Sequence, residues 1–398
     1  MSIPYTFSRT AAGLKRSVMR DLMALAVSPD VISFAGGLPA SDHLPLEQLR
    51  TCFDAVLSRD GARALQYGPP YVPLREWLAA YMQRRGVDCT VENIFITSGA
   101  QQGLEILARL FLDEGAPEVL EAITFTGIQQ AAQGHGALVR TVPVDLKTGI
   151  DVEALETVLA RSPRARLGVV IPDFHNPLGV SVPAAHRARI AELAARHRVP
   201  IVEDDPYSPL RHAGEAQRPI KAYDEAGAVI YLGSFSKMLA PAMRLGWMVA
   251  PAALVARLTV LRESIDLESS QFIQRVAVEF LTRGWLEPHL AQLNAANRER
   301  RDALFAALER ELGGLVSWTR PEGGLFVWVT LPAGVDAAEL FKAAVARQVA
   351  FIPGGAFAVE GGYANTMRLN YSNVTPANIA EGLRRLGAVL KERLAVTV

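Results

Sequence analysis

The chain has 398 residues, a length that predicts two or three domains. Half of its residues are hydrophobic and 21% are charged, as in ordinary globular proteins rather than disordered or fibrous ones. Lys plus Arg number 41 and Asp plus Glu number 41, so the formal net charge is zero. A neutral chain has no global positive field to attract nucleic acid or a membrane surface.

Cysteine spacing and hydropathy exclude further classes. Cys52 and Cys89 lie far apart and outside any metal-ligand spacing, so the sequence predicts no metal site and no disulfide framework. No apolar run approaches the ~20 residues that a membrane helix needs. The apolar stretch at residues 23–27 is too short for the hydrophobic part of a signal peptide. We therefore expect a cytoplasmic protein that binds neither membranes nor nucleic acid.

The middle of the chain alternates short apolar runs with helical patterns. Ile94–Thr97 is a β-type run, and a helical pattern with Leu104 and Leu107 on one face follows it. Further strands are predicted at residues 167–171, 199–202, 229–232 and 246–249, and a helix is predicted to begin at Pro183. This alternation predicts a mainly parallel sheet covered on both faces, with ligands beyond the carboxyl ends of its strands.

The last quarter of the chain has a different pattern. Residues 285–312 predict one long amphipathic helix, which Gly313 and Gly314 end. Strand-like segments at 325–329 and 366–371 then alternate with helical patterns at 336–347 and from Pro376 onward, as in a small α+β unit. We expect the long helix to bridge a large and a small domain.

The most informative short segment is GSFSK at residues 233–237, where Lys237 lies just beyond a predicted buried strand. A desolvated lysine loses its proton near neutral pH and becomes a nucleophile for a carbonyl carbon. The hydroxyls of Ser234 and Ser236 can donate hydrogen bonds to a phosphate. Alone, this motif is more typical of a solvated loop lysine.

Three other polar segments also follow predicted strands. Ser98 and Gly99 lie at a strand-to-helix junction, where free N–H groups favour an anion, although a plain helix cap is the alternative. Asp204 can pair with a buried cationic ring nitrogen, and Asn176 begins the segment NPLG; both segments are also typical of turns. Because all of these segments fall at carboxyl ends of strands, we expect them to form one site.

Together these motifs resemble the fold type I aminotransferases of class I/II, which depend on pyridoxal 5′-phosphate (PLP), and most closely the 2-aminoadipate and kynurenine aminotransferase branch. The resemblance covers nearly the whole chain, from about Ser17 to the last helix. It implies an α/β fold with a mainly parallel seven-stranded sheet in a large domain and a smaller α+β domain. Residues 1–45 would form an arm that contributes to the small domain and the active site. Residues 46–284 would form the large PLP-binding domain, and residues 285–398 the bridging helix and small domain.

The resemblance also implies a role for each motif residue. Lys237 would hold PLP as an internal aldimine and move protons, and Asp204 would keep the pyridine nitrogen protonated. Asn176 and Tyr207 would bond the phenolic oxygen of the ring, with Tyr207 counted among the catalytic residues. The phosphate ligands would be Ala100, Gln101, Ser234, Ser236 and Arg244, joined by Tyr67 from the neighbouring subunit of a homodimer with shared sites.

Several positions bear on the substrate. Arg368 would clamp its α-carboxylate with a bidentate fork, close to Asn176, Gly37 and the neighbour's Tyr67. Arg20 matches an arginine that meets the distal carboxylate of acidic substrates in this branch; an exposed helix arginine is the alternative. Phe125 stands where the family usually has a tyrosine stacked on the PLP ring. It would keep the stacking face and lose the hydroxyl, unless it serves only in core packing.

The resemblance therefore predicts an aminotransferase that moves the amino group of an acidic, aromatic or branched amino acid to a 2-oxo acid such as 2-oxoglutarate, by a ping-pong route through a Lys237 aldimine. Another PLP reaction on this fold stays open: that of a lyase, a decarboxylase or a racemase. Arg368 argues against decarboxylation, because it would secure the group that has to leave. A PLP-sensing regulatory domain would accompany a basic DNA-binding module, which a neutral chain does not favour.

Overall fold

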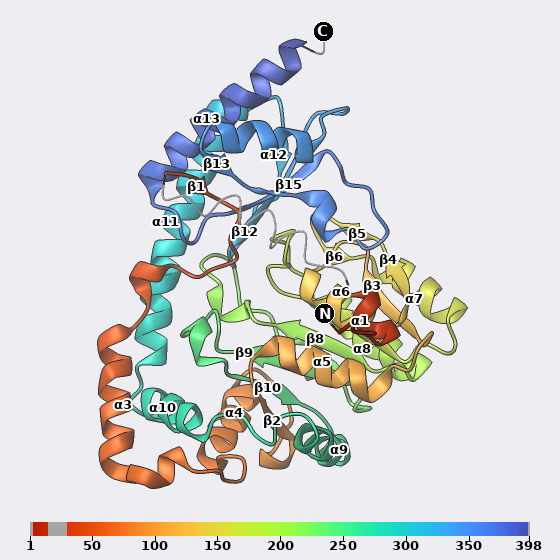
Figure 1. The fold of residues 1–398 in the computed structure, drawn as a ribbon, viewed down its shortest axis with the longest axis vertical. Coiled ribbons are helices and arrows are strands. Elements are labelled where there is room, and N and C mark those ends of the chain that lie inside the picture. Colours follow the sequence, from red (N-terminus) through yellow and green to blue (C-terminus); the bar gives the residue numbers. More distant parts are fainter. Residues whose placement is uncertain (1–2, 15–29, 397–398) are drawn as a thin grey trace.

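The structure, a computed structural model, describes residues 3–14 and 30–396. Figure 1 shows a central sheet with helices around it and a smaller unit that carries the C-terminal helix. Within the described residues the central sheet has seven strands, in the order β2 (Ile94–Thr97), β10 (Gly246–Val249), β9 (Val229–Ser234), β8 (Ile201–Asp205), β7 (Leu167–Val170), β3 (Pro117–Glu121) and β4 (Leu138–Val142). Strand β10 is antiparallel to both of its neighbours, and the pairings from β9 to β4 are parallel. The predicted sheet is confirmed.

Helices cover both faces of this sheet because successive side chains of each strand point to opposite sides. In β8, Val202 packs on one face and Ile201 on the other. The Val202 face is covered by α5 (Ala100–Phe111), α6 (Thr126–Gly134) and α9 (Ala252–Glu263). The opposite face is covered by α3 (Leu46–Asp60), α4 (Val72–Arg84) and α10 (Gln271–Thr282) over one half and by α7 (Val152–Arg161) and α8 (Ala184–His197) over the other.

The strand predicted at residues 199–202, with the acidic pair Glu203 and Asp204 at its end, spans Ile201–Asp205 in the structure, so β8 includes this pair. Charged side chains are unusual in a buried strand, but here buried backbone N–H groups donate hydrogen bonds to one of them. Glu203 accepts hydrogen bonds from the N–H groups of Ile220 (2.7 Å) and Lys221 (2.8 Å). The extension carries Asp204 to the rim of the sheet.

The smaller unit is built on a four-stranded antiparallel sheet of the described residues, in the order β11 (Ser317–Trp318), β12 (Phe326–Thr330), β15 (Thr366–Asn370) and β14 (Ile352–Pro353). Its core lies against α12 (Ala337–Ala346), α13 (Pro376–Val396) and the second half of α11 (Leu286–Leu312). Leu286 at the start of α11 belongs instead to the core beside β10. The predicted long helix and the α+β pattern after it are therefore present, and α11 packs against both units.

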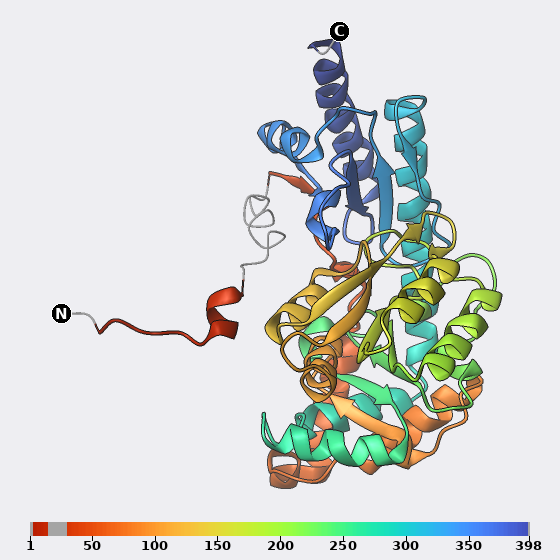
Figure 2. The ribbon, with the colours of Figure 1, turned by 90° about the vertical axis from the view of Figure 1, so that its right-hand side faces the viewer.

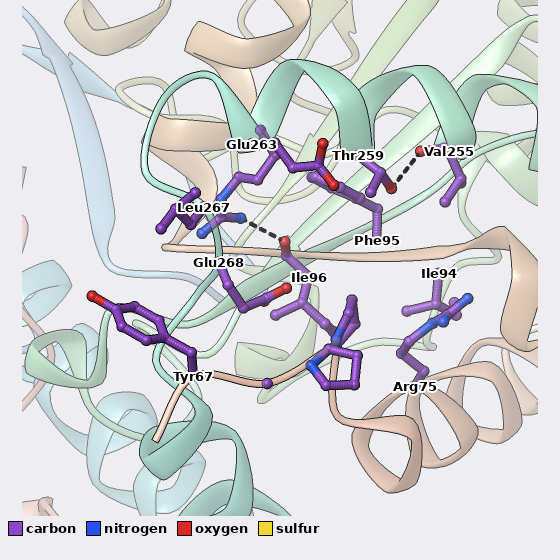
Figure 3. Close-up of a pocket in the computed structure, with 14 residues that line it drawn as sticks. Tyr67, Arg75, Ile94, Phe95, Ile96, Val255, Thr259, Glu263, Leu267 and Glu268 are labelled. Atoms are coloured by element: carbon purple, nitrogen blue, oxygen red, sulfur yellow. Dashed lines mark hydrogen bonds between the residues drawn. The ribbon is translucent and has the colours of Figure 1, made fainter. Parts of the chain in front are cut away.

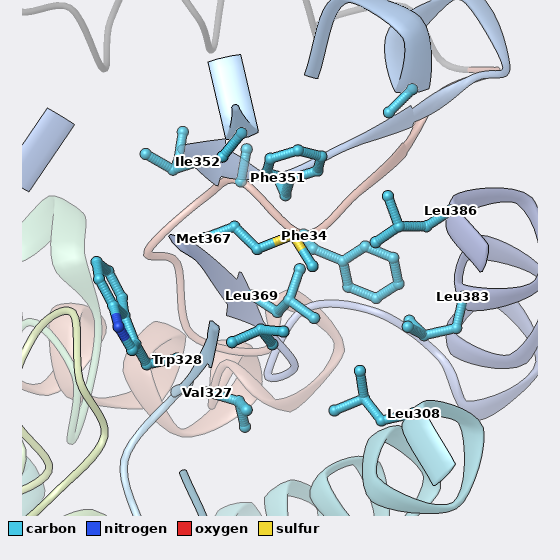
Figure 4. Close-up of a cluster of buried hydrophobic side chains, with 14 of the residues drawn as sticks. Phe34, Leu308, Val327, Trp328, Phe351, Ile352, Met367, Leu369, Leu383 and Leu386 are labelled. Carbon is cyan, nitrogen blue, oxygen red and sulfur yellow. The ribbon is translucent and has the colours of Figure 1, made fainter. Parts of the chain in front are cut away.

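Residues 32–35 of the arm pack in the smaller unit. Strand β1 (Ile32–Ser33) pairs in parallel with β13 (Val349–Ala350), and Phe34 packs in the same core as Leu383 and Leu386 (Figure 4). Helix α1 (Arg9–Gly13) lies against α6, and the described residues before it project from the body in Figure 2. A two-stranded ribbon, β5 (Val144–Asp145) and β6 (Gly149–Ile150), completes the strands described. The domain boundaries at 45 and 284 stay a prediction.

None of the helices in residues 3–14 and 30–396 combines the length and the hydropathy that a membrane crossing requires.

Candidate active site

The motif segments meet at one edge of the central sheet. Because β2, β3, β7, β8 and β9 run in the same direction, the segments that follow them lie at the same edge. Arg244 also lies at this edge because it directly precedes the antiparallel strand β10. That these segments together form one functional site stays a prediction.

Lys237 lies just beyond β9 and is partly buried. Its Nζ donates a hydrogen bond to the carbonyl oxygen of Gly37 (2.8 Å). Burial, followed by the positive charges of Arg368 and Arg244, lowers the pKa of Lys237 to about 8. The amine is therefore neutral in an appreciable fraction of molecules near neutral pH, which a nucleophile or a base requires.

Asp204, at the end of β8, is 3% exposed, and its Oδ1 has no hydrogen-bond partner among the described residues. Burial raises the pKa of Asp204 to about 7, and the negative charges of Asp205 and Glu121 add to the effect. A buried carboxylate without a partner is costly, so this position favours a cationic group as its ligand.

Asp205 points to the opposite face of the sheet and fixes the end of β8. Its Oδ2 accepts hydrogen bonds from Arg85 Nη2 (2.9 Å), Ser208 Oγ (2.6 Å) and the Tyr231 hydroxyl (2.9 Å). Although burial opposes ionisation, Arg85 and Ser208 hold the pKa of Asp205 below its ordinary value. This charged network anchors the turn that presents Asp204 on the other face.

Arg368, Asn176 and Tyr207 form a continuous hydrogen-bonded chain. Asn176 Nδ2 donates to the Tyr207 hydroxyl (3.3 Å), and Asn176 Oδ1 accepts from Arg368 Nη1 (2.8 Å). Arg368 Nη2 donates to the carbonyl oxygen of Ala35 (2.6 Å). The planar side chain of Arg368 is thereby oriented toward the arm and the turn after β7.

The guanidinium of Arg368 is a buried cation. It is 1% exposed and lies over the rings of Phe326 (4.3 Å) and Phe357 (4.8 Å). Burial lowers its pKa to about 10, which still leaves it charged at neutral pH. Its Nε has no hydrogen-bond partner in the described part of the chain. Such a group favours an incoming carboxylate.

The turn that begins α5 forms an anion cradle with Arg244. Gly99 caps the helix with φ of 84°, and a Cβ at this position would lie 2.7 Å from Arg244 Nη2. Arg244 donates from Nη2 to the carbonyl oxygen of Ser98 (3.1 Å) and itself has a positive φ of 47°. Ser234 Oγ accepts from the N–H of Ser236 (3.1 Å). Helix N–H groups, an arginine and two serines suit a phosphate.

Two further predicted site residues, Gln101 and Tyr67, have exposed side chains. Gln101 is exposed and donates to the carbonyl oxygen of Gly127 (3.0 Å), beside the half-buried Phe125 at the start of α6. Tyr67 is 87% exposed and lies on the wall of another cavity, so this chain does not bring it to the cradle (Figure 3). Arg20 lies outside the described residues.

The family follows from comparison with known proteins. Residues 29–386 match the model of the family "Aminotransferase class I and II". The chain belongs to this family. It is a transaminase with fold type I and PLP as its cofactor, as the sequence predicted.

Two relatives and one solved structure resemble the transaminase over nearly its full length. It is 40% identical to aromatic-amino-acid aminotransferase 1 of Thermococcus litoralis, over 98% of this chain and 94% of the relative. It is also 40% identical to 2-aminoadipate transaminase of Thermus thermophilus, over 98% of each chain. The crystal structure of a multiple substrate aminotransferase from Thermococcus profundus matches with a TM-score of 0.93 at 39% identity, over 98% of each chain.

The described residues fit PLP. The unpartnered Oδ1 of Asp204 suits a protonated ring nitrogen, and the low pKa of Lys237 suits an amine that reacts with an aldehyde. Glycine at position 99 leaves the space that a Cβ would fill beside Arg244, where a phosphate can approach the backbone. The individual roles of these residues stay predictions.

Proposed function

We propose that the transaminase moves the amino group of an α-amino acid with an acidic, aromatic or branched side chain to a 2-oxo acid such as 2-oxoglutarate, in the two half-reactions of a ping-pong cycle. The observation that carries the proposal is the hydrogen-bonded chain from the buried cation of Arg368 through Asn176 to Tyr207, which supports a carboxylate site beside the residues proposed to hold PLP. The relatives named for aromatic amino acids and 2-aminoadipate support this substrate range.

Bound PLP supplies an aldehyde that condenses with the amino group and a ring that withdraws electrons from Cα. Lys237 would be the base that takes the proton from the substrate Cα and the acid that returns it, a role for which its lowered pKa is suited. Asp204 would hold the ring nitrogen in its protonated form, and Asn176 and Tyr207, which are hydrogen-bonded to each other, would bind the phenolic oxygen. Arg368 fixes the substrate carboxylate and thereby the orientation of the Cα–H bond.

The remaining residues bind and orient. Phosphate contacts are proposed for Ser234, Ser236, Arg244 and the first N–H groups of α5, at Ala100 and Gln101. We propose that Phe125 stacks on the ring and that Gly37 lets the backbone approach the substrate. Arg20 is proposed to bind the distal carboxylate of acidic substrates.

The active form is proposed to be a homodimer with shared sites. Tyr67 is almost fully exposed in the single chain, which supports a role in the site of the second subunit. We retain the division into an arm (1–45), a large domain (46–284) and a bridging helix with the small domain (285–398) as part of this proposal.

A spectroscopic half-reaction tests the proposed function. PLP-loaded protein is mixed with single L-amino acids in the absence of any oxo acid, and the absorbance of bound cofactor is followed. We expect 2-aminoadipate, glutamate, aromatic or branched amino acids to convert the aldehyde form to the aminated form, and 2-oxoglutarate to reverse the change. Lys237→Ala should abolish conversion, and Arg368→Lys should lower kcat/KM about 100-fold. A wild-type spectrum that no amino acid changes would count against transamination of these substrates.

A further inference from the structure

Arg262, a buried arginine of α9, forms hydrogen bonds to the turn that begins α5 and contributes to the anion cradle. Arg262 is 3% exposed. Its Nη1 donates to the carbonyl oxygen of Ile96 (2.9 Å), a bond drawn in Figure 3, and its Nη2 donates to Ser98 Oγ (3.2 Å). One guanidinium thus fixes the last residues of β2 and the first residue of the turn.

A second route connects the same two groups. The N–H of Ser98 donates to Gln102 Oε1 (2.7 Å), and Gln102 Nε2 donates to Asp266 Oδ2 (2.5 Å). Asp266 is in turn the ion-pair partner of Arg262. The hydrogen bonds close a ring through Ser98, Gln102, Asp266 and Arg262. A closed ring of this kind restricts the orientation of the turn more than a single bond does.

The network also reaches the segment that carries Tyr67. Arg262 Nη2 donates to Ser269 Oγ (2.9 Å), and the Ser269 carbonyl accepts from Gln274 Nε2 (3.0 Å). Gln274 Oε1 accepts from the N–H of Tyr71 (3.2 Å). Gln271 adds two bonds, to the carbonyl oxygens of Gly68 (3.2 Å) and Pro69 (2.6 Å).

A cavity of about 620 Å³ lies between these parts, and both Tyr67 and Arg262 line it. Figure 3 shows Tyr67 at one end of the cavity wall and the β2 residues Ile94 and Ile96 along it. The wall therefore runs from the strand that leads to the cradle to the exposed phenol of Tyr67.

We propose that Arg262 is a positioning residue for the PLP phosphate in both subunits of the dimer. In its own subunit it sets the turn at Ser98, and through Ser269 and Gln274 it sets the segment from which Tyr67 reaches the partner's phosphate. The inference rests on the proposed function. Its physical basis is that a phosphate gains most from N–H and hydroxyl donors that are already oriented before binding.

The test compares the affinity of apoenzyme for PLP with that for pyridoxal, which lacks the phosphate. Affinities are measured from the absorbance of bound cofactor. Gln102→Ala breaks the ring of hydrogen bonds at an accessible position. Arg262→Lys keeps the positive charge but loses the planar guanidinium that donates several hydrogen bonds at once. We expect both variants to bind PLP at least about 10-fold more weakly and pyridoxal as wild type does, since roughly one oriented charge-assisted bond is lost.

Thr259→Val is the matched control. Thr259 lies one turn before Arg262 on α9 and lines the same cavity, but among the described residues its hydroxyl donates only to the Val255 carbonyl of its own helix (3.0 Å). It should leave both affinities unchanged. An unchanged preference for PLP over pyridoxal in Gln102→Ala and Arg262→Lys would overturn the inference, as would an equal loss for both ligands.

A separate experiment tests the route from Arg262 through Gln274 to Tyr67. Gln274→Ala and Tyr67→Phe should each weaken PLP binding, and the double variant should be no weaker than the weaker single variant, because both act on one contact. Additive losses would overturn the route through Gln274. Wild-type protein that binds neither PLP nor pyridoxal would instead contradict the proposed function.

Discussion

Asp204 is a buried carboxylic acid whose environment favours a cationic ligand. Its Oδ1 has no partner among the described residues, whereas the adjacent Asp205 has Arg85, Ser208 and Tyr231. Two neighbouring carboxylates on opposite faces of one strand thus have opposite pKa shifts, that of Asp204 raised and that of Asp205 lowered. The buried carboxylate of Asp204 therefore destabilises the apoenzyme, and the same carboxylate is suited to hold a protonated ring nitrogen when the cofactor binds.

The raised pKa of Asp204 predicts how apoenzyme stability depends on pH. The folded state binds the proton of Asp204 more tightly than the unfolded chain does. The contribution of Asp204 to the free energy of unfolding is therefore fully present below pH 3.8 and is lost as the pH rises to about 7. Asp204→Asn should therefore stabilise the apoenzyme at pH 8, by a few kcal/mol at most. The gain should shrink toward zero near pH 4. Chemical denaturation of both proteins at the two pH values measures it, and a gain of equal size at both would contradict the explanation.

At the scale of single elements, the start of α5 depends on Gly99 for two separable reasons. Its φ of 84° is strained for any other residue, and a Cβ would meet the guanidinium of Arg244. Gly115 has a similar φ of 77°, but nothing lies within 4 Å of a Cβ placed there. The pair separates backbone strain from loss of the cradle.

Gly99→Ala and Gly115→Ala should each lower the free energy of unfolding by about 1 kcal/mol, the cost of a positive φ for a residue with a Cβ. Only Gly99→Ala should also weaken PLP binding, because Arg244 has to move. Thermal melts of the two apoenzymes and PLP titrations provide the comparison. If Gly115→Ala reduced PLP affinity as much, the effect at Gly99 would have to be general strain.

The elements show what the sequence could and could not predict. Strands β2, β7, β9 and β10 were predictable because both faces are buried, which leaves continuous apolar runs. Strand β3 contains Glu118 and Glu121, and β4 lies at the edge with a partly exposed pattern, so neither showed such a run. Both glutamates are nevertheless buried.

The candidate site divides in the same way. Lys237, Asp204 and Asn176 each come a few residues after a predicted strand, so their position at one edge of the sheet could be inferred from the order of elements. Arg262 could not be inferred, because its partner Ile96 is 166 positions away and only the folded chain brings them together. The acceptor for Arg368 at residue 35 is a backbone carbonyl, which no residue type in the sequence indicates.

At the scale of the whole molecule, the proposed dimer has two sites, each with a lysine from one subunit and Tyr67 from the other. Mixing two defective proteins tests this arrangement. Lys237→Ala and Tyr67→Ala homodimers should each be inactive or weak at limiting PLP, but a mixed dimer would contain one site with both residues intact.

Subunit exchange between the two variants should therefore restore activity to about a quarter of the wild-type level, because half of the dimers are mixed and one of their two sites is complete. Activity at limiting PLP before and after exchange is the measurement, with each variant incubated alone as the control. No gain after verified exchange would show that Tyr67 serves its own subunit.

The last helix offers a practical handle. Helix α13 packs against α11 and ends at the tip of the molecule farthest from β2 and β10 in Figure 1. Residues 391–393 in its last turns are exposed, whereas Ala35 and Gly37 near the other end of the described chain supply the carbonyls that Arg368 and Lys237 bind. Immobilisation on a resin or an electrode through the end of α13 would leave the sheet edge open to reactants.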